Sequence, residues 1–108
     1  MKTMILIPAL APGAELIDYL QALSDAQLGQ LVVVDDGSGP DYAPIFALAA
    51  QIPGCTVLRH EQNRGKGDAL KTGLRYFQEL PDRSEYNGVV TADADGQHSV
   101  ADVTALCR

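Results

Sequence analysis

The sequence predicts a parallel α/β fold in which helices cover both faces of one sheet. Four short apolar runs alternate along the chain with segments whose apolar residues recur at helical spacing. Each run is apolar on both faces, as expected for strands that helices cover from either side. Polar or glycine-rich turns follow the runs, and such turns mark the edge where open α/β sheets bind ligands.

The predicted strands are rich in aliphatic and β-branched residues, which favour an extended backbone. They span Met4–Ile7, Leu31–Val34, Cys55–Leu58 and Gly88–Ala92. Consecutive runs are far enough apart for a helical crossover, and parallel strands need such a connection. The spacing therefore favours repeated βαβ units over hairpins.

The first two connections each predict one helix. In the first, Leu16, Leu20 and Leu23 fall on one helical face. In the second, Asp41 is a candidate N-cap for a helix that runs to about Ala50, because a short polar side chain there satisfies a free backbone amide. Both helices are expected to pack against the sheet.

The last two helices are predicted from an apolar stripe and from a capping pattern. Apolar residues between Leu70 and Phe77 mark the third helix, whose interior Gly73 costs about 1 kcal/mol relative to alanine. One interpretation of this glycine is that the helix backbone approaches the sheet or a ligand closely. The other is that the glycine is incidental. Ser99 and Asp102 form a capping-box pattern, so a fourth helix is expected to begin just after the last acidic turn.

Right-handed crossovers and one reversal of winding predict a doubly wound, Rossmann-like sheet with strand order 3-2-1-4. The ends of the first and fourth strands then lie side by side at a topological switch point. Four polar or backbone-permissive segments reach that edge: Pro8-Ala9, Asp35 to Ser38, Asn63 to Gly67, and Asp93 to His98. We expect these segments to surround one ligand-binding crevice.

Length and charge limit the classes of partner. The chain has 108 residues, which suits one compact domain. Its formal net charge of −6 argues against a nucleic-acid or anionic-membrane surface, because such surfaces are basic. No apolar run approaches the ~18 residues of a membrane-spanning helix. We therefore expect a cytoplasmic protein with no membrane segment in these residues.

Two acidic turns at the predicted edge indicate a metal-dependent site. Asp35 and Asp36 follow the second strand, whereas Asp93, Asp95 and Gln97 follow the fourth. Carboxylate and amide oxygens are the ligands that hard cations such as Mg²⁺ and Mn²⁺ prefer. A bound cation would let an acidic chain attract a ligand that carries phosphate.

Familiar phosphate-binding motifs are absent. No G-x-G-x-x-G follows the first strand and no G-x-x-x-x-G-K-[ST] occurs, which weakens dinucleotide and P-loop hypotheses. A phosphotransfer enzyme of the haloacid dehalogenase type is an alternative, because it also has D-x-D after a strand. A nucleotidyltransferase and a non-catalytic interaction module are further alternatives.

Three motifs occur in a fixed order along the chain. They are Val32 to Ser38, Asn63 to Leu70 with Gly73, and Ala92 to His98. In combination they resemble the N-terminal, nucleotide-binding half of a family 2 glycosyltransferase with the GT-A fold, particularly the dolichol- or polyprenyl-phosphate sugar synthase branch. The resemblance implies that residues 1–108 form a single nucleotide-sugar-binding domain that is part of a larger GT-A domain.

The resemblance implies a nucleotide site beside the first two strands. Asp35 or Asp36 would hydrogen-bond the base, and an ionised carboxylate suits the donor edge of uracil or guanine. Ser38 lies in the same turn, and Pro8 and Ala9 at the end of the first strand would line the same crevice. The implied donor is a UDP- or GDP-linked sugar.

The resemblance places the diphosphate and its metal near the other two motifs. Asp93, Asp95 and Gln97 would hold Mg²⁺ or Mn²⁺, with Asp93 also near the ribose. Gly65 and Lys66 would donate hydrogen bonds toward the ribose or phosphates. The metal would stabilise charge on the diphosphate as the glycosidic bond breaks.

The resemblance also implies functions that these residues do not carry. An inverting displacement at the anomeric carbon needs an acceptor, polyprenyl phosphate being one candidate, and a catalytic base that we expect beyond Arg108. We therefore expect the 108 residues to bind a donor without turnover, and the full-length protein to work at the cytoplasmic face of a membrane. Truncation would leave the strand at Gly88–Ala92 with an open edge, which predicts self-association.

Overall fold

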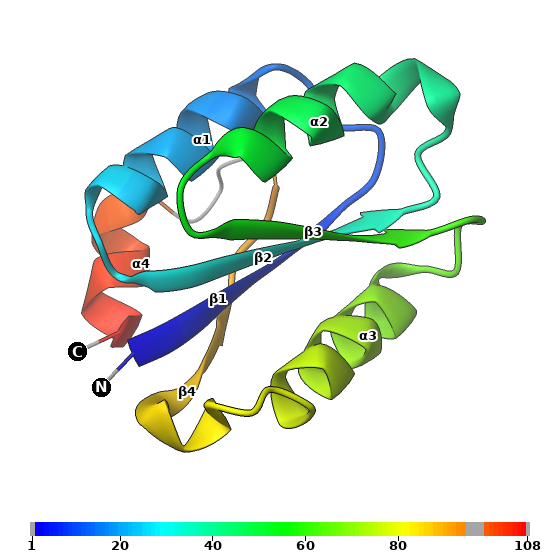
Figure 1. Cartoon of the computed structure of the whole chain (residues 1–108). Coiled ribbons are helices and arrows are strands. Elements are labelled where there is room, and N and C mark those ends of the chain that lie inside the picture. Colours follow the sequence, from blue (N-terminus) through cyan, green and yellow to red (C-terminus); the bar gives the residue numbers. More distant parts are fainter. Residues whose placement is uncertain (1, 95–98, 108) are drawn as a thin grey trace.

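An open parallel sheet lies between two layers of helices (Figure 1). The structure, a computed structural model, describes residues 2–94 and 99–107. Its strands are β1 (Lys2–Ala9), β2 (Gly29–Asp36), β3 (Cys55–His60) and β4 (Tyr86–Thr91). They pair in parallel in the order β3-β2-β1-β4, which confirms the predicted doubly wound topology.

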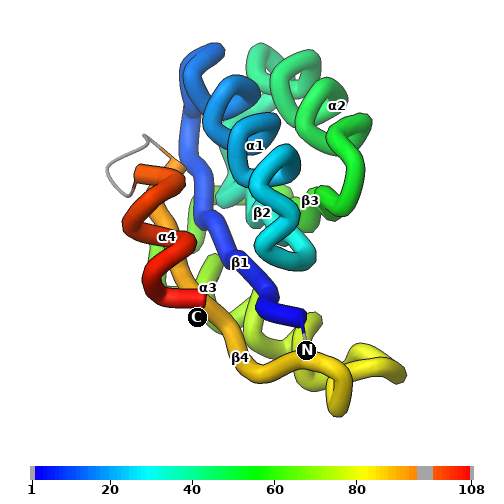
Figure 2. Tube along the Cα trace, turned by 90° about the vertical axis from the view of Figure 1, so that its left-hand side faces the viewer, coloured from blue at the N-terminus to red at the C-terminus, as the bar shows by residue number. Residues whose placement is uncertain are grey.

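Helices and short 3₁₀ turns connect the strands, and one further helix follows the last strand. In chain order they are α1 (Glu15–Asp25), η1 (Pro40–Tyr42), α2 (Ala43–Gln51), α3 (Lys66–Gln78), η2 (Arg83–Glu85) and α4 (Val100–Cys107). Helices α1, α2 and α4 cover one face of the sheet and α3 covers the other, as Figure 1 and Figure 2 show together. The helices therefore occupy both faces, as the apolar strands predict.

Three strands extend further toward the carboxyl edge of the sheet than the apolar runs predict. β1 ends at Ala9, β2 at Asp36 and β3 at His60. Asp36 lies opposite His60 in the register of β2 and β3, so backbone pairing continues after the apolar run ends. Asp35, Asp36 and His60 are consequently held by the sheet ladder and not by a loose turn.

The predicted cap of the second helix is wrong. α2 begins at Ala43 with Tyr42 in the N-cap position, and no side chain caps it. Pro40 starts the 3₁₀ turn η1, and Asp41 lies inside that turn, one residue before the cap. The proline thus begins helical structure too early for Asp41 to serve.

The capping box predicted for the fourth helix is present. The Asp102 amide donates to Ser99 Oγ at 3.1 Å, and the Ser99 amide donates to Asp102 Oδ2 at 3.4 Å. These reciprocal contacts satisfy amides that have no partner within the first turn of a helix. They fix the start of α4 at Val100.

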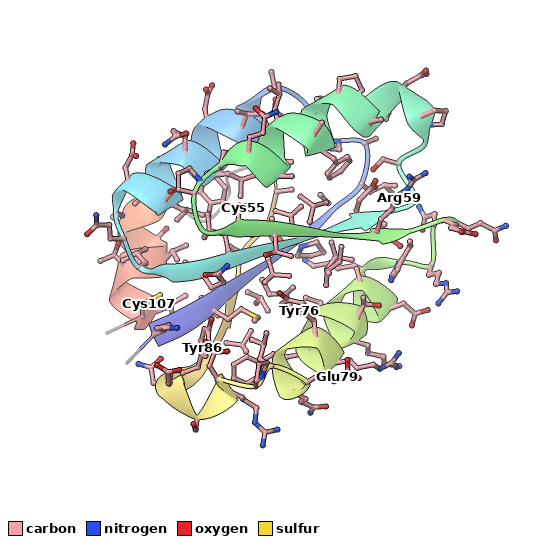
Figure 3. All side chains as sticks on the ribbon, viewed as in Figure 1. Cys55, Arg59, Tyr76, Glu79, Tyr86 and Cys107 are labelled. Carbon is pink, nitrogen blue, oxygen red and sulfur yellow. The ribbon has the colours of Figure 1, made fainter. Side chains whose placement is uncertain are left out.

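The core has two layers because alternate residues of a strand point to opposite faces of the sheet. The central strands β1 and β2 supply eight core side chains, each at most 1% exposed. Those facing α1, α2 and α4 are Ile5, Ile7, Leu31 and Val33, and those facing α3 are Met4, Leu6, Val32 and Val34. On the α3 side, Tyr86 packs edge-to-face against Phe77, with ring centroids 5.6 Å apart, and lies beneath the sheet in Figure 3.

A close approach of α3 to β1 explains Gly73. A Cβ atom at this position would overlap Leu6 Cδ1 and lie 2.7 Å from Leu6 Cδ2. Leu6 is fully buried, so it has no free space to move into. The structure therefore supports the first interpretation of this glycine, close packing against the sheet. Gly67, also in α3, has open space where its Cβ would be.

We predict that Gly73→Ala is less stable than Gly67→Ala by about 1–3 kcal/mol, the usual cost of forcing an extra methyl group into a packed core. Gly67 lies in the first turn of α3, where alanine gains less helix propensity than in the interior, so a lower stability of Gly73→Ala can only come from the overlap with Leu6. Urea unfolding followed by circular dichroism measures the free energy of unfolding. Equal stability of the two variants would contradict this packing.

Candidate functional site

A cavity of about 480 Å³ opens at the carboxyl edge of the sheet. Four segments that are distant in sequence meet around it: the loop after β1, the end of β2, the start of α3 with the loop before it, and the segment after β4. These are the segments expected at the switch point of the predicted topology. The structure therefore forms one crevice from them.

Six of the predicted nucleotide-sugar-binding residues line this cavity: Pro8, Ala9, Asp36, Gly65, Lys66 and Asp93. Asp35, near the end of β2, and Ser38, in the turn that follows β2, are not part of the lining. The predicted metal ligands Asp95 and Gln97 lie outside the described residues. The structure thus assembles most of the predicted set, and binding itself stays a prediction.

The turn after β2 fixes the loop after β1. The Asp35 carboxylate accepts a hydrogen bond from the Ser38 amide at 3.0 Å, and Ser38 Oγ accepts one from the Ala11 amide at 2.8 Å. Ala11 has a φ of +47°, which is uncommon for a residue with a Cβ atom. The hydrogen bond therefore holds a strained backbone at the cavity wall, and Asp35 and Ser38 shape the cavity from behind.

The same turn packs backbone against backbone on the loop before α3. Gly37 has a φ of +72°, and a Cβ atom on it would overlap the Asn63 nitrogen and lie 2.9 Å from Asn63 Cα. Glycine meets both requirements, because it lacks the Cβ and tolerates positive φ. The acidic turn and the glycine-rich loop are consequently one packed unit.

Asp36 joins three elements through its carboxylate. Oδ1 bonds His60 Nδ1 at 2.9 Å and accepts the Arg64 amide at 2.9 Å, while Oδ2 accepts the Gly65 amide at 2.9 Å. The side chain of Asp36 is 4% exposed. The end of β2 is therefore tied both to the end of β3 and to the loop that leads into α3.

These hydrogen bonds keep the Asp36 carboxyl group ionised. Burial, the largest single influence, raises the pKa of this group because it disfavours the charged form. The Arg64 amide, the His60 ring and the Gly65 amide together outweigh burial, so the pKa lies below its ordinary value of 3.8. An ionised carboxylate can only accept hydrogen bonds, which is what the two amides require.

The same contacts limit which carboxylate oxygen can meet a ligand. Each oxygen has about two lone-pair positions. Both positions on Asp36 Oδ1 are filled, whereas Oδ2 accepts the Gly65 amide and retains one. Base recognition by Asp36 would therefore use Oδ2. The other candidate, Asp35, is 5% exposed and uses Oδ1 to accept the Ser38 amide.

An ion pair connects the start of α3 to the segment after β4. Lys66 Nζ lies 2.9 Å from Asp93 Oδ1, and the two side chains are 64% and 26% exposed. Gly65 is the N-cap of α3, so Lys66 is the first helical residue. Because a helix N-terminus carries partial positive charge, this side of the cavity is cationic and the Asp93 side is anionic. The cavity can thus attract groups of either sign.

Sequence reasoning missed several residues around the site. The loop from Leu10 to Gly13 and Glu15 also line the cavity. The buried partner of Asp36, His60, was missed as well. Register gives a signal for it, because aligning the two apolar runs at their first residues places His60 opposite Asp36.

A divalent cation fits the one predicted ligand that the structure places. Asp93 lines the cavity, and its carboxylate oxygens suit a hard cation. Among residues 2–94 and 99–107, no group of three or more His, Cys, Asp or Glu side chains is arranged to hold a metal ion. The same residues contain no helix with the length and apolar character needed to cross a bilayer.

Comparison with known protein families matches residues 5–107 to Glycosyl transferase family 2. The chain belongs to that family. Membership confirms the predicted resemblance and favours the glycosyltransferase hypothesis over the haloacid dehalogenase and nucleotidyltransferase alternatives.

Two curated proteins resemble this family 2 chain over most of its length. The uncharacterized protein MJ1222 of Methanocaldococcus jannaschii is 34% identical over 104 residues, which are 96% of this chain and 40% of that protein. A UDP-N-acetylglucosamine–dolichyl-phosphate N-acetylglucosaminyltransferase of Methanococcus voltae is 26% identical over 117 residues, 96% of this chain and 45% of that protein. The chain therefore spans less than half the length of these relatives.

A solved structure shares the fold of this family 2 chain. The crystal structure of S. aureus TarS 1–349 superposes with a TM-score of 0.60 at 20% sequence identity, and the match covers 97% of this chain and 32% of that one. Similarity at this level of identity shows the fold alone. It agrees with the predicted GT-A architecture.

We predict that Asp36 makes the stability of this family 2 chain depend on pH in the acid range. Because the folded pKa lies below 3.8, the stabilisation from this carboxylate is complete above about pH 4 and is lost as the pH falls through the folded pKa. Urea unfolding of the wild type and Asp36→Asn between about pH 6 and about pH 3 measures the effect. The difference between them should be largest at the upper pH and shrink at the lower.

Asp41→Asn is the control for this experiment, because Asp41 is an exposed carboxylate outside the site. Its difference from the wild type should stay small throughout. A wild-type advantage over Asp36→Asn that is constant with pH would contradict the ionised, hydrogen-bonded Asp36.

Proposed function

We propose that the cavity binds a nucleotide-diphosphate sugar, the donor substrate of a glycosyltransferase. The observation that carries this proposal is the meeting of Asp36, Lys66 and Asp93 around one cavity in a family 2 chain. The three residues come from segments far apart in sequence, and one ligand in the cavity would reach all of them. A ligand with a base at one end and a charged diphosphate at the other suits that distribution.

The nucleoside would lie against the ends of β1 and β2. Pro8 and Ala9 supply an apolar wall, and Asp36 Oδ2 or the Asp35 carboxylate would accept hydrogen bonds from the donor edge of uracil or guanine. Ser38 would act indirectly, by holding Ala11 and the rest of the first loop in place. The proposed donors are accordingly UDP- or GDP-linked sugars.

The diphosphate would lie against the start of α3. Helix N-termini bind phosphate groups because their free amides and partial positive charge point at the anion. Lys66 adds an ammonium group at this end, and Gly65 lets the backbone approach closely because no atom lies where its Cβ would be. Lys66 would exchange its partner Asp93 for a phosphate oxygen.

We propose Mg²⁺ or Mn²⁺ as the cofactor, held by Asp93, Asp95 and Gln97. All three offer oxygen ligands, which these cations prefer. When bound, the metal would neutralise the diphosphate and make the nucleoside diphosphate a better leaving group. Asp93 would thus bind the cation through the carboxylate that Lys66 releases.

The whole protein would transfer the sugar to an acceptor with inversion at the anomeric carbon. The M. voltae relative is named for transfer to dolichyl phosphate, which supports polyprenyl phosphate as one candidate acceptor. Within the part of the chain that the structure describes, we assign no residue as the catalytic base. A cytoplasmic location stays a prediction.

We predict that UDP or GDP together with Mn²⁺ raises the thermal unfolding temperature of this chain. A ligand at about 100 times its dissociation constant stabilises the folded state by about 2.7 kcal/mol. Differential scanning fluorimetry with each nucleotide, with and without Mn²⁺, measures the shift. Asp95→Ala should remove the Mn²⁺-dependent part, because it removes a proposed metal ligand.

Asp41→Ala is the matched control for this shift, since Asp41 is exposed and lies outside the cavity lining. It should respond to nucleotide and Mn²⁺ as the wild type does. No shift in the wild type with either nucleotide would contradict donor binding, and a full Mn²⁺ response in Asp95→Ala would contradict the metal assignment.

We also propose that this chain self-associates through the edge of β4, the predicted Gly88–Ala92 region. In the described residues, β4 pairs with β1 on one side and with no strand on the other. The Ala92 amide donates to the Leu6 carbonyl at 3.0 Å, so the alternation of a parallel ladder turns the Thr91 amide outward. Outward amides on an edge strand are a template for pairing with another chain.

We predict that Thr91→Pro weakens this self-association, because proline has no amide hydrogen to donate to a second chain. Thr91→Val is the matched control, since it changes the same exposed side chain and keeps the amide. Light scattering across a concentration series gives the mean mass of each variant. A wild type that stays monomeric at every concentration would rule out the proposed edge pairing.

A further inference from the structure

A chain of two buried polar side chains and one partly buried one lies behind the cavity and links β2, β3 and α3. His60 bonds Asp36 Oδ1 through Nδ1 at 2.9 Å and Thr72 Oγ1 through Nε2 at 2.6 Å. The side chain of His60 is 7% exposed and that of Asp36 is 4% exposed. Neither His60 nor Thr72 lines the cavity. Both residues therefore act on the site, if at all, through Asp36.

The carboxylate fixes the direction of each hydrogen bond in this chain. Because ionised Asp36 can only accept, the hydrogen of the His60 ring belongs on Nδ1. In the neutral ring Nε2 is then an acceptor, and the Thr72 hydroxyl donates to it. We assign the tautomer from these partners. It satisfies all three side chains at once, and Thr72 sets the orientation of the ring.

The same carboxylate anchors the loop that leads into α3. Asp36 accepts the Arg64 and Gly65 amides at 2.9 Å each, and Lys66 follows as the first helical residue. Rotation of the carboxylate would take the acceptor away from the Arg64 amide and would leave the Gly65 amide with Asn63 Oδ1, at 2.9 Å, as its acceptor. His60 occupies the second position on Oδ1 and resists that rotation.

Packing alone does not require polar groups at this place. The cluster between the sheet and α3 is mainly aliphatic and aromatic, with Leu6, Val34 and Ala69 fully buried within it. Burying an imidazole or a hydroxyl group is unfavourable unless each is hydrogen-bonded, and an aliphatic side chain would fill the space without that requirement. The presence of His60 and Thr72 here is therefore explained by their effect on Asp36, whose carboxylate they hold in one orientation.

We infer that His60 and Thr72 are positioning residues that lock the Asp36 carboxylate, and thereby hold the backbone from Arg64 to Lys66 in the form that meets the diphosphate. The part that concerns the diphosphate rests on the proposed function. The hold on the loop does not, because it exists in the chain without any ligand.

Amide hydrogen exchange, measured by NMR on the ligand-free chain, tests the hold on the loop. Thr72→Val keeps the shape of the side chain and removes the hydroxyl, so exchange of the Arg64 amide should accelerate about tenfold. Exchange of the Gly65 amide should accelerate less, because this amide also donates to Asn63 Oδ1. Thr104→Val is the matched control, because Thr104 is also a partly buried helical threonine, with its hydroxyl bonded to the Val100 carbonyl at 2.7 Å. It should leave both amides unchanged.

Two substitutions of His60 separate the roles of its nitrogens. His60→Asn places an amide donor near the position of Nδ1 but does not reach Thr72, so it should lose no more protection at Arg64 and Gly65 than Thr72→Val does. His60→Gln places its amide near the position of Nε2, away from Asp36, and should lose more. The inference is overturned if Thr72→Val and His60→Gln leave both amides at wild-type rates, if they accelerate the amides of β1 equally, or if His60→Asn loses as much protection as His60→Gln.

Calorimetric titration with UDP and with GDP, in the presence of Mn²⁺, connects the loop to the ligand. Thr72→Val and His60→Gln should weaken the affinity of the nucleotide that binds the wild type about tenfold, whereas Thr104→Val should stay near the wild type. If the wild type binds neither nucleotide, the proposed function fails and the exchange rates still decide the positioning role. Accelerated exchange with unchanged affinity would overturn the link to the ligand.

Discussion

The hydrogen bonds of the Asp36 carboxylate are the interaction on which the candidate site depends. This one side chain ends a central strand and accepts two backbone amides from the loop that leads into α3. Hydrogen bonds to a charged group contribute about 1.5–3 kcal/mol each, so the loop cannot leave the carboxylate freely. Gly37 reinforces the contact, because its backbone lies directly against Asn63. The cavity wall is therefore set by the sheet, through β2, more than by the loop itself.

Much of the fold could be predicted because its causes are local or topological. Apolar runs identify the strands, and the handedness of crossovers restricts their order. The capping box at Ser99 and Asp102 was visible as a pattern three residues apart, and its hydrogen bonds are present. Asp41 failed as a cap because a neighbour, Pro40, starts a 3₁₀ turn first. Competition between adjacent local signals is hard to decide from sequence.

The location of the site could be predicted from the sequence, whereas most of its side-chain contacts could not. Strand ends and turn chemistry brought Asp36, Lys66 and Asp93 to one edge, as the topology requires. Sequence gave no reason to separate Asp35 from Asp36, because their difference lies in which face of β2 each side chain takes. The partnership of Asp36 with His60 joins residues that are 24 positions apart. It depends on strand register, which no single motif contains.

The pairing of Lys66 with Asp93 bears on how charged ligands would enter. Exposed ion pairs are worth only ~0–1 kcal/mol, and this ammonium group is mostly in solvent. Each side chain could therefore replace a weak ion-pair partner with a stronger one. The Asp93 carboxylate would bind the proposed divalent ion, and the Lys66 ammonium group would bind an anionic oxygen. For the proposed ligand, admission is then a swap of partners, and the rim need not accumulate unbalanced charge at any stage.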